Sequence, residues 1–294
     1  MRMDYSLSND KLDVTFKSKG GTLKSIKNKE GLEYLWQGDP AFWSGQAPIL
    51  FPICGSIRND TASVGNGKTM SMPRHGIIRK KEFSMEEKTK DRIVFSICSD
   101  EESNKQFPYD YKVSEIFTLK DSTITVTYRV ENIGTEKMPF FVGGHPAFCC
   151  PLEAGERFED YHVKFPQKET CSTPDPVPGT GLQNMHQRTP LMQDSDDLPL
   201  SYALFANDAR VLDNLGSRRA TLVSSVSGKG VRLDFADFRY LLLWNNKEGR
   251  FLAMEPWTGL STTTDEDDVF EHKNNVQYAM PAESREYTYS ITIF

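Results

Sequence analysis

The sequence predicts an all-β protein, a large antiparallel β-sandwich that forms one domain over residues 1–294. Apolar and polar side chains alternate along residues 123–130 and 287–293, as in strands with one buried and one solvated face. Strand patterns of this kind recur along the whole chain, and amphipathic helical periodicity is almost absent. All-β folds often reach this length as a single domain, so 294 residues do not require a second one.

The first half of the chain contains two regions of regular strand pattern. Residues 12–16 alternate up to Gly20-Gly21, and residues 23–36 continue as a short strand meander. Residues 111–119 and 124–130 are expected to form an antiparallel hairpin. This hairpin leads directly into the segment that carries the first candidate site residue.

That segment places His145 after two glycines and before a proline, at the expected end of a strand. Paired glycines allow the backbone to approach a ligand or another strand closely. Pro146 favours an extended backbone at His145 and prevents a helix there. The imidazole is therefore expected on a stiff ledge at a strand end.

The stretch Gly65-Asn66-Gly67-Lys68-Thr69 ends like a phosphate-binding loop. The earlier glycine that this motif requires falls at Ala62, and no strand-to-helix transition surrounds it. Asn66-Gly67 between two short strands is typical of a type I′ hairpin turn. We therefore predict a hairpin here and no nucleotide site.

The second half of the chain contains further strand patterns and one long irregular stretch. Residues 167–200 are rich in proline and glycine, and we predict a long excursion loop there. The expected strands lie at residues 161–165, 220–223, 231–235, 240–244, 251–257 and 287–293.

Composition excludes several classes of protein. The formal net charge is -6, which gives no electrostatic reason to expect nucleic acid or an anionic membrane as partner. No apolar run approaches the ~20 residues of a membrane-spanning helix, and residues 1–11 lack the apolar core of a secretion signal. The five cysteines are an odd number without CxxC spacing, as expected for reduced thiols. We expect a cytoplasmic protein.

Five polar residues lie at expected strand ends or in tight loops: Arg58, His75, His145, Asp208 and Glu255. Each one alone has an ordinary explanation as a surface arginine, a turn or strand-cap histidine, a loop aspartate or a strand-end glutamate. Their order and their neighbours indicate more than this.

The local sequences around these residues resemble the aldose 1-epimerase (galactose mutarotase) family, and most closely its bacterial LacX-like branch. Ser56 stands where that branch commonly has arginine, so Arg58 becomes the candidate substrate arginine. The similarity covers most of the chain, implies a mutarotase-like supersandwich, and is carried by residues 48–55, Met72-Pro73-Arg74-His75-Gly76, Gly144-His145-Pro146-Ala147-Phe148, Phe205-Ala206-Asn207-Asp208-Ala209 and Ala253-Met254-Glu255-Pro256-Trp257.

The resemblance implies a cofactor-independent epimerase that interconverts the anomers of an aldose or of its phosphate. This reaction removes the proton of the anomeric hydroxyl and protonates the ring oxygen, so it requires one base, one acid and no cofactor. Glu255 is implied as the base and His145 as the acid. His75, Arg58 and Asp208 are implied to hold sugar hydroxyls.

Side-chain chemistry is consistent with these roles. A glutamate with a pKa near its reference value of about 4.3 is ionised at neutral pH. A carboxylate close to His145 would raise the histidine pKa above about 6.5 and favour its acidic form. Trp257 or Trp244 is expected to present an aromatic face to the sugar ring.

Several other functions fit parts of the same pattern. A non-catalytic carbohydrate-binding module needs no acid–base pair. A distance of more than about 10 Å between His145 and Glu255 would favour this alternative over the enzyme. A glycoside hydrolase needs two suitably placed carboxylates, and only Glu255 stands out. A zinc enzyme needs closer ligand spacing than His75 and His145 offer. A usual serine hydrolase needs a Gly-x-Ser-x-Gly elbow, which the sequence lacks. A hexose-6-phosphate epimerase would use basic residues such as Arg74, Lys247 or Arg250.

Overall fold

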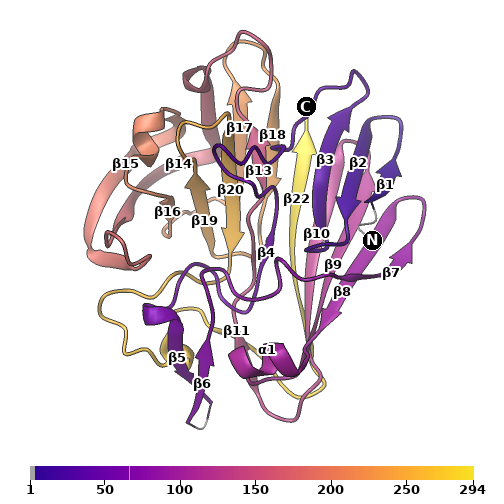
Figure 1. Cartoon of the computed structure of the whole chain (residues 1–294). Coiled ribbons are helices and arrows are strands. Elements are labelled where there is room, and N and C mark those ends of the chain that lie inside the picture. Colours follow the sequence, from indigo (N-terminus) through magenta and orange to yellow (C-terminus); the bar gives the residue numbers. More distant parts are fainter. Residues whose placement is uncertain (1–3, 66) are drawn as a thin grey trace.

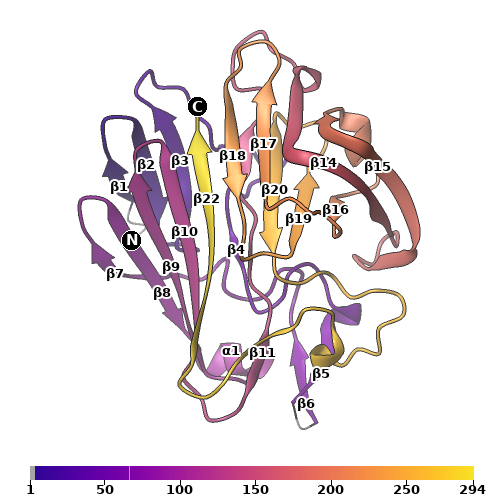
Figure 2. The same cartoon turned by 180° about the vertical axis from the view of Figure 1, so that it is seen from behind.

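The computed structural model describes residues 4–65 and 67–294, and its architecture confirms the predicted all-β sandwich. A nine-stranded antiparallel sheet has the order β15-β14-β17-β18-β22-β10-β9-β8-β7. Two smaller sheets, β1-β2-β3 and β16-β19-β20-β12-β4, lie over one of its faces (Figures 1 and 2). Among the described residues, no helix is long and apolar enough to cross a membrane.

The large sheet consists of β7 (Ser84–Lys88), β8 (Arg92–Cys98), β9 (Tyr111–Lys120), β10 (Thr123–Asn132), β14 (Tyr161–Pro176), β15 (Gln183–Pro199), β17 (Arg219–Ser224), β18 (Gly230–Asp234) and β22 (Ser284–Ile293). The smaller sheets consist of β1 (Asp4–Ser8), β2 (Leu12–Lys17), β3 (Thr22–Asn28), β4 (Ile49–Leu50), β12 (Gly143–Gly144), β16 (Arg210–Leu212), β19 (Tyr240–Trp244) and β20 (Phe251–Trp257), with β13 (Ala147–Cys149) paired to β20.

Shorter elements close the ends of the sandwich. They are β5 (Thr61–Val64) with β6 (Lys68–Ser71), β11 (Met138–Phe140) with β21 (Gln277–Ala279), the helix α1 (Glu101–Gln106), and the 3-10 turns η1 (Arg58–Asp60), η2 (Phe158–Asp160), η3 (Tyr202–Phe205) and η4 (Phe270–His272). The side chains of Asp100 and Ser103 form a capping box at the start of α1. At six residues, α1 is too short to have produced a helical periodicity in the sequence.

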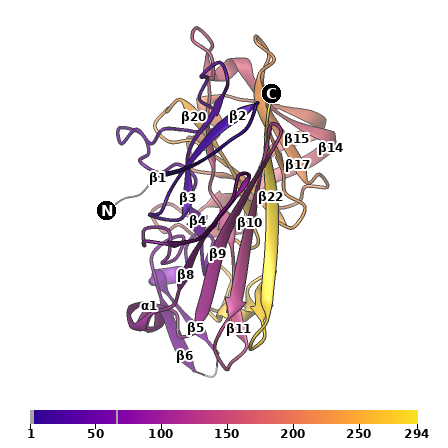
Figure 3. The ribbon, with the colours of Figure 1, turned by 90° about the vertical axis from the view of Figure 1, so that its right-hand side faces the viewer.

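The hairpin of β9 and β10 is the predicted one, with Lys120 opposite Thr123 and Tyr111 opposite Asn132. The alternating burial of β10 gives that strand one core face and one half-solvated face, whereas the middle of β9 is buried on both faces. Seen from the side in Figure 3, β9, β10 and β22 run along much of the length of the molecule. They form the rigid wall against which the smaller sheets pack.

The prediction of a long loop over residues 167–200 was wrong. Most of this segment belongs to β14 and β15, which pair as an extended hairpin at the edge of the large sheet. The pairing contains four register shifts, and these irregularities obscure the period-2 pattern in the sequence. Proline is tolerated in edge strands and at bulges because no ladder hydrogen bond is lost there.

The predicted short hairpin after residue 60 is present as β5 and β6, with Val64 opposite Lys68. The residue at the centre of the expected type I′ turn, Asn66, lies outside the described residues. The strand expected at residues 32–36 is reduced to isolated bridges, in which Glu33 faces Lys27 and Leu35 faces Phe148.

One hydrophobic cluster, whose members run from Leu7 to Ile293, fills the space between the sheets. Phe16 of β2 is fully buried, and its ring packs 4.8 Å from Phe117 of β9 and 6.3 Å from Phe95 of β8. These aromatic contacts join the small N-terminal sheet to the large one. The organisation as a single domain stays a prediction from the sequence.

We expect the substitution Phe16→Ala to lower the free energy of unfolding by about 3–5 kcal/mol, because it leaves a cavity between two sheets. Urea unfolding followed by tryptophan fluorescence measures this loss. The matched control is Val226→Ala at a position that is 69% exposed, where a change within about 0.5 kcal/mol is expected. Equal losses in both variants would contradict this account of the core.

Candidate active site

The register of two strand segments places His145 opposite Glu255. In the pairing of β12 and β13 with β20, Gly143 faces Trp257 and Ala147 faces Ala253. The same register puts position 145 across from position 255, so the two side chains form a direct cross-strand pair. Proximity of these residues follows from backbone pairing of central strands.

A glycine at position 143 is required for this pairing to be so close. A Cβ atom there would lie 2.8 Å from Cδ1 of Trp257 and 3.0 Å from Sγ of Cys54. Gly143 also pairs with Leu50 of β4 on its other side. The segment before His145 is therefore held between two strands, which fixes where the imidazole can point.

The imidazole Nε2 of His145 lies 3.2 Å from the carboxyl Oε2 of Glu255. Both side chains are buried, with 8% and 2% exposed. Within the described residues, neither Nδ1 of His145 nor Oε2 of Glu255 completes a hydrogen bond of ordinary geometry. The separation is far below about 10 Å, so reach is no obstacle to proton transfer by both groups at one substrate.

Burial disfavours the charged form of each partner. It raises the pKa of Glu255 well above its ordinary value and lowers the pKa of His145 to about 3. The short contact acts in the opposite sense, because a carboxylate stabilises a neighbouring imidazolium. The neutral pair and the ion pair contain the same number of protons and differ only in which side chain holds the proton.

This differs from the pKa values expected from the sequence. There Glu255 was expected to ionise as in water, and His145 to have a raised pKa. The family resemblance implied a carboxylate near His145 but not complete desolvation of the pair, and burial opposes the effect of that neighbour.

His75 lies in the loop that follows β6, with its backbone in the left-handed region at φ 71°. Its ring Nδ1 accepts a hydrogen bond from the Gly55 N–H at 3.1 Å, and the backbone N–H of His75 donates to the Gly55 carbonyl at 2.8 Å. A neutral ring that accepts at Nδ1 carries its proton on Nε2. Burial, followed by His145 and the nearby arginines, lowers the pKa of His75 well below its usual value.

Three tryptophans enclose the two histidines. The indole of Trp43 stacks on the His145 ring with centroids 4.7 Å apart and planes at 28°. Trp244 meets His145 edge-on at 5.4 Å, and Trp257 meets His75 edge-on at 5.4 Å. These rings provide apolar faces beside the polar pair.

These residues surround a cavity of about 270 Å³ that we call the inner cavity. Its lining contains both acid–base candidates, three aromatic rings and two arginines. The full lining is Trp43, Arg74, His75, Arg79, His145, Asp208, Ala209, Trp244, Asn246, Glu255 and Trp257.

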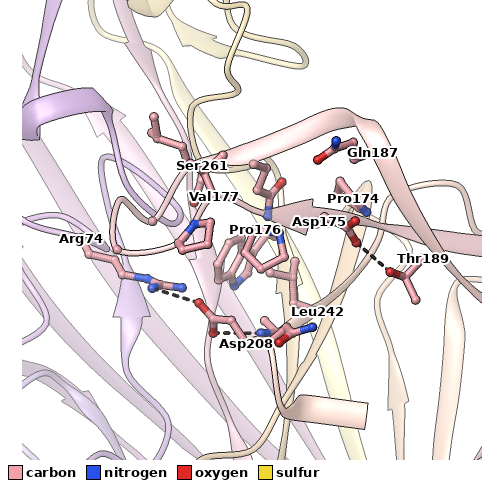
Figure 4. A pocket seen from close by; sticks show the side chains of 18 residues that line it. Arg74, Pro174, Asp175, Pro176, Val177, Gln187, Thr189, Asp208, Leu242 and Ser261 are labelled. Carbon is pink, nitrogen blue, oxygen red and sulfur yellow. Dashed lines mark hydrogen bonds and ion pairs between the residues drawn. The ribbon is translucent and has the colours of Figure 1, made fainter. Parts of the chain in front are cut away.

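Asp208 reaches the inner cavity from the loop between η3 and β16, with φ at 91°. Its carboxylate pairs with Arg74, with Nη1 and Oδ2 3.6 Å apart, and the two side chains point toward each other in Figure 4. A positive φ is unfavourable for a non-glycine residue, and such strain is often found at functional sites.

Arg58 lies elsewhere. Its guanidinium pairs with Asp268 at 3.0 Å, and it also donates to the carbonyls of Thr263 and Glu266. Within the described part of the chain, Arg58 is not among the residues that line the inner cavity. A substrate contact by Arg58 stays a prediction, and the structure brings Arg74 and Arg79 to the cavity in its place.

Sequence reasoning missed Trp43, Arg79 and Asn246 as lining residues. Trp43 lies in a long irregular loop, where an aromatic residue carries no positional signal. The Asn246 side chain donates to the Phe42 carbonyl at 2.8 Å and so holds that loop in place. Arg79 follows His75 by four residues, and this closeness to a candidate histidine was the one available hint.

Comparison with known proteins identifies the class to which this arrangement belongs. The family model for aldose 1-epimerase matches residues 3–274. The chain belongs to the aldose 1-epimerase family.

Individual relatives are similar to this chain over nearly its whole length. Protein LacX from a Lactococcus lactis subsp. lactis plasmid is 46% identical over 297 residues, covering 99% of each protein. The crystal structure of a galactose mutarotase related enzyme from Lactobacillus acidophilus matches with a TM-score of 0.92 and 28% identity, over 99% of this chain and 97% of that one. A galactose mutarotase-like protein from Lactobacillus casei ATCC 334 has a TM-score of 0.90 at 28% identity, over 99% and 100% of the two chains.

We expect His75 to stay neutral, with its proton on Nε2, throughout the range from pH 5 to pH 8. Its pKa is depressed in the folded protein, so protonation occurs only well below the reference value of about 6.5. Nitrogen-15 NMR of the imidazole rings reports the tautomer and the charge, and the spectrum of His75→Asn assigns the signal. A His75 signal that titrates near pH 6.5 would contradict the placement of this ring.

Proposed function

We propose that this protein is an aldose 1-epimerase that interconverts the α and β anomers of a sugar without a cofactor. The observation that carries this proposal is the direct contact between a buried imidazole and a buried carboxyl, 3.2 Å apart in a cavity walled by aromatic rings. Membership of the aldose 1-epimerase family supports the same reaction class.

The geometry of the pair suits the two oxygens that react. The anomeric hydroxyl oxygen and the ring oxygen of a pyranose are bonded to the same carbon, so they lie side by side. Two adjacent proton-transfer groups on one wall of the cavity can therefore reach both oxygens at once. A glycoside hydrolase instead requires two carboxyl groups about 5–10 Å apart on either side of a scissile bond.

Ring opening then follows from one concerted shift of protons. The Glu255 carboxylate takes the proton of the anomeric hydroxyl, and the His145 imidazolium gives a proton to the ring oxygen. The bond between the anomeric carbon and the ring oxygen breaks, and the anomeric carbon becomes a carbonyl. Rotation of this carbonyl end and the reverse proton transfers close the ring on the other face.

The proton count of the pair is the same before and after this step. The ring-closed state corresponds to Glu255 carboxylate with His145 imidazolium, and the ring-opened state corresponds to the two neutral groups. Burial favours the neutral groups and the short contact favours the ion pair. Passage between these two states in either direction is what an acid–base pair needs for ring opening and ring closure.

The other lining residues are assigned to binding. His75 donates from Nε2 to a sugar oxygen, because its Nδ1 already accepts from Gly55. Asp208 and Arg79 contact sugar hydroxyls, and Trp257 with Trp43 packs against the apolar face of the ring.

We expect Glu255→Gln and His145→Asn each to reduce kcat for anomer exchange by at least ~10²-fold, because each removes one of two proton-transfer groups. Exchange is measured by NMR on a panel of free and phosphorylated aldoses. Matched controls are Glu286→Gln and His162→Asn, whose side chains are in surface ion pairs with Arg129 and Asp197. Anomer exchange at the wild-type rate in the Glu255 and His145 variants would contradict the acid–base proposal.

A non-catalytic sugar-binding protein on the same fold makes the opposite prediction in this experiment. It would accelerate exchange of no sugar in the panel, and its binding of sugar would survive both substitutions. That outcome would favour the sugar-binding protein over the enzyme.

A second candidate is an epimerase of hexose 6-phosphates, and the guanidinium of Arg79 favours it. Arg79 is partly buried at the inner cavity, and burial together with Arg74 lowers its pKa. No carboxylate among the described residues forms an ion pair with Arg79 within 4.0 Å, and a partly desolvated, unpaired cation is a binding point for an anion. Lys247 and Arg250, by contrast, are exposed.

If a phosphate binds at Arg79, we expect Arg79→Met to raise KM for glucose 6-phosphate at least ~10-fold more than KM for glucose. The reason is the loss of a charge-assisted hydrogen bond of about 1.5–3 kcal/mol. Steady-state exchange rates for both sugars test this, with Arg250→Met as the matched control. Equal effects on both sugars would assign Arg79 to a ring hydroxyl and count against the phosphate.

A further inference from the structure

A second and larger cavity, which we call the outer cavity, opens directly beside the inner one. Its volume is about 760 Å³, and four residues line both cavities: Arg74, Asp208, Ala209 and Trp257. Small-molecule sites usually measure about 300–1,000 Å³. The inner cavity of about 270 Å³ is thus sized for one small ring, whereas both cavities together offer room for a longer ligand.

The wall of the outer cavity comes from the hairpin of β14 and β15 and its connecting loop, as Figure 4 shows around Pro174, Pro176 and Val177. This loop is tied to the segment after β20. The Gln183 N–H donates to the Thr262 carbonyl at 3.2 Å, and the Thr264 N–H donates to the Gln183 carbonyl at 3.0 Å. The wall is therefore attached to the same region of the protein that carries Glu255 and Trp257.

One polar group in this wall lacks a partner. Gln183 is only 8% exposed and lines the outer cavity, and its side-chain Oε1 accepts no hydrogen bond from any described residue. A buried amide oxygen without a donor costs free energy. This oxygen is itself shielded from solvent, so a ligand hydroxyl would satisfy it once the amide turns toward the cavity.

The charges of the outer cavity favour a neutral ligand. Arg74 is its one cationic side chain among the described residues, and Arg74 is already paired with Asp208. A second carboxylate, Asp175, accepts a hydrogen bond from the Thr189 hydroxyl at 2.7 Å, as drawn in Figure 4. The lining is thus acidic on balance and would repel a phosphate, whereas amides and hydroxyls beside apolar surface suit a sugar.

We propose that the outer cavity binds a second, uncharged sugar ring, so that the substrate is the reducing end of a disaccharide or longer saccharide. This inference rests on the proposed epimerase function. The reducing-end ring occupies the inner cavity over His145 and Glu255, and the neighbouring ring lies between Trp257 and Gln183. The shared residues Arg74 and Asp208 lie where the two rings join.

Two measurements test the proposal on the full-length protein. Calorimetry with the wild type is expected to give at least ~5-fold tighter binding of one of maltose, cellobiose or lactose than of glucose, galactose or glucose 6-phosphate. NMR exchange rates are expected to rank the same disaccharide above the monosaccharides in kcat/KM. Equal or weaker binding of every disaccharide would overturn the proposal, as would tightest binding of glucose 6-phosphate.

The variant Val177→Trp fills the outer cavity from a partly exposed loop position. We expect it to lower the ratio of disaccharide to monosaccharide kcat/KM at least ~10-fold, and the same substitution at the remote, exposed Val226 to leave this ratio unchanged. If Val177→Trp does not fold, Gln183→Leu is expected to weaken disaccharide binding at least ~5-fold. A ratio that stays constant in the cavity variants would overturn the inference.

The outcomes separate this inference from the proposed catalysis. Preferred disaccharide binding without exchange of any sugar would remove the epimerase and retain the second-ring site. Exchange of monosaccharides with no preference for disaccharides would retain the epimerase and remove the second-ring site. Absence of both binding and exchange would overturn both.

Discussion

The backbone register between the segment at residues 143–149 and β20 is the constraint on which the site depends. It sets His145, in the two-residue gap between β12 and β13, across from Glu255, because strand pairing on both sides of the gap fixes its position. Side chains in central strands are held more precisely than side chains in loops, because both neighbouring strands restrict the backbone. A slip of one residue in this register would send the imidazole to the opposite face of the sheet.

The conformation of the site is unfavourable in itself, and packing elsewhere in the fold must offset its free-energy cost. His75 and Asp208 have positive φ values, and residues in such conformations cost about 1–3 kcal/mol each. A buried imidazole, a buried carboxyl and a partly buried arginine add desolvation costs. The large aromatic core between the sheets offsets these costs and holds the strained loops in place.

Sequence reasoning recovered the parts of this structure that obey a local pattern. Strand β10 of the β9–β10 hairpin alternates without interruption, and the segments around His145 and Glu255 are local motifs at strand ends. Those signals survive because each depends on a few consecutive residues.

The parts that were missed depend on tertiary context. The β14–β15 hairpin has four register shifts, so its strands show no steady alternation. Trp43 and Arg79 are ordinary residues in sequence and reach the cavity only because distant segments place them there. The pKa values of Glu255 and His145 depend on burial, which a list of neighbours along the chain does not contain.

The two halves of the site have different structural origins. Glu255 lies on β20, a central strand of the six-stranded sheet, and His145 lies beside it between β12 and β13, whereas the wall of the outer cavity comes from an edge hairpin with an irregular register. Central strands tolerate little change, but an edge hairpin can change length and side chains without disturbing the sheet behind it. In the proposed epimerase, the groups that open the sugar ring are thereby separate from the groups that select what is attached to that ring. In this chain the hairpin places a mildly acidic wall of amide, hydroxyl and apolar groups next to the proposed acid–base pair.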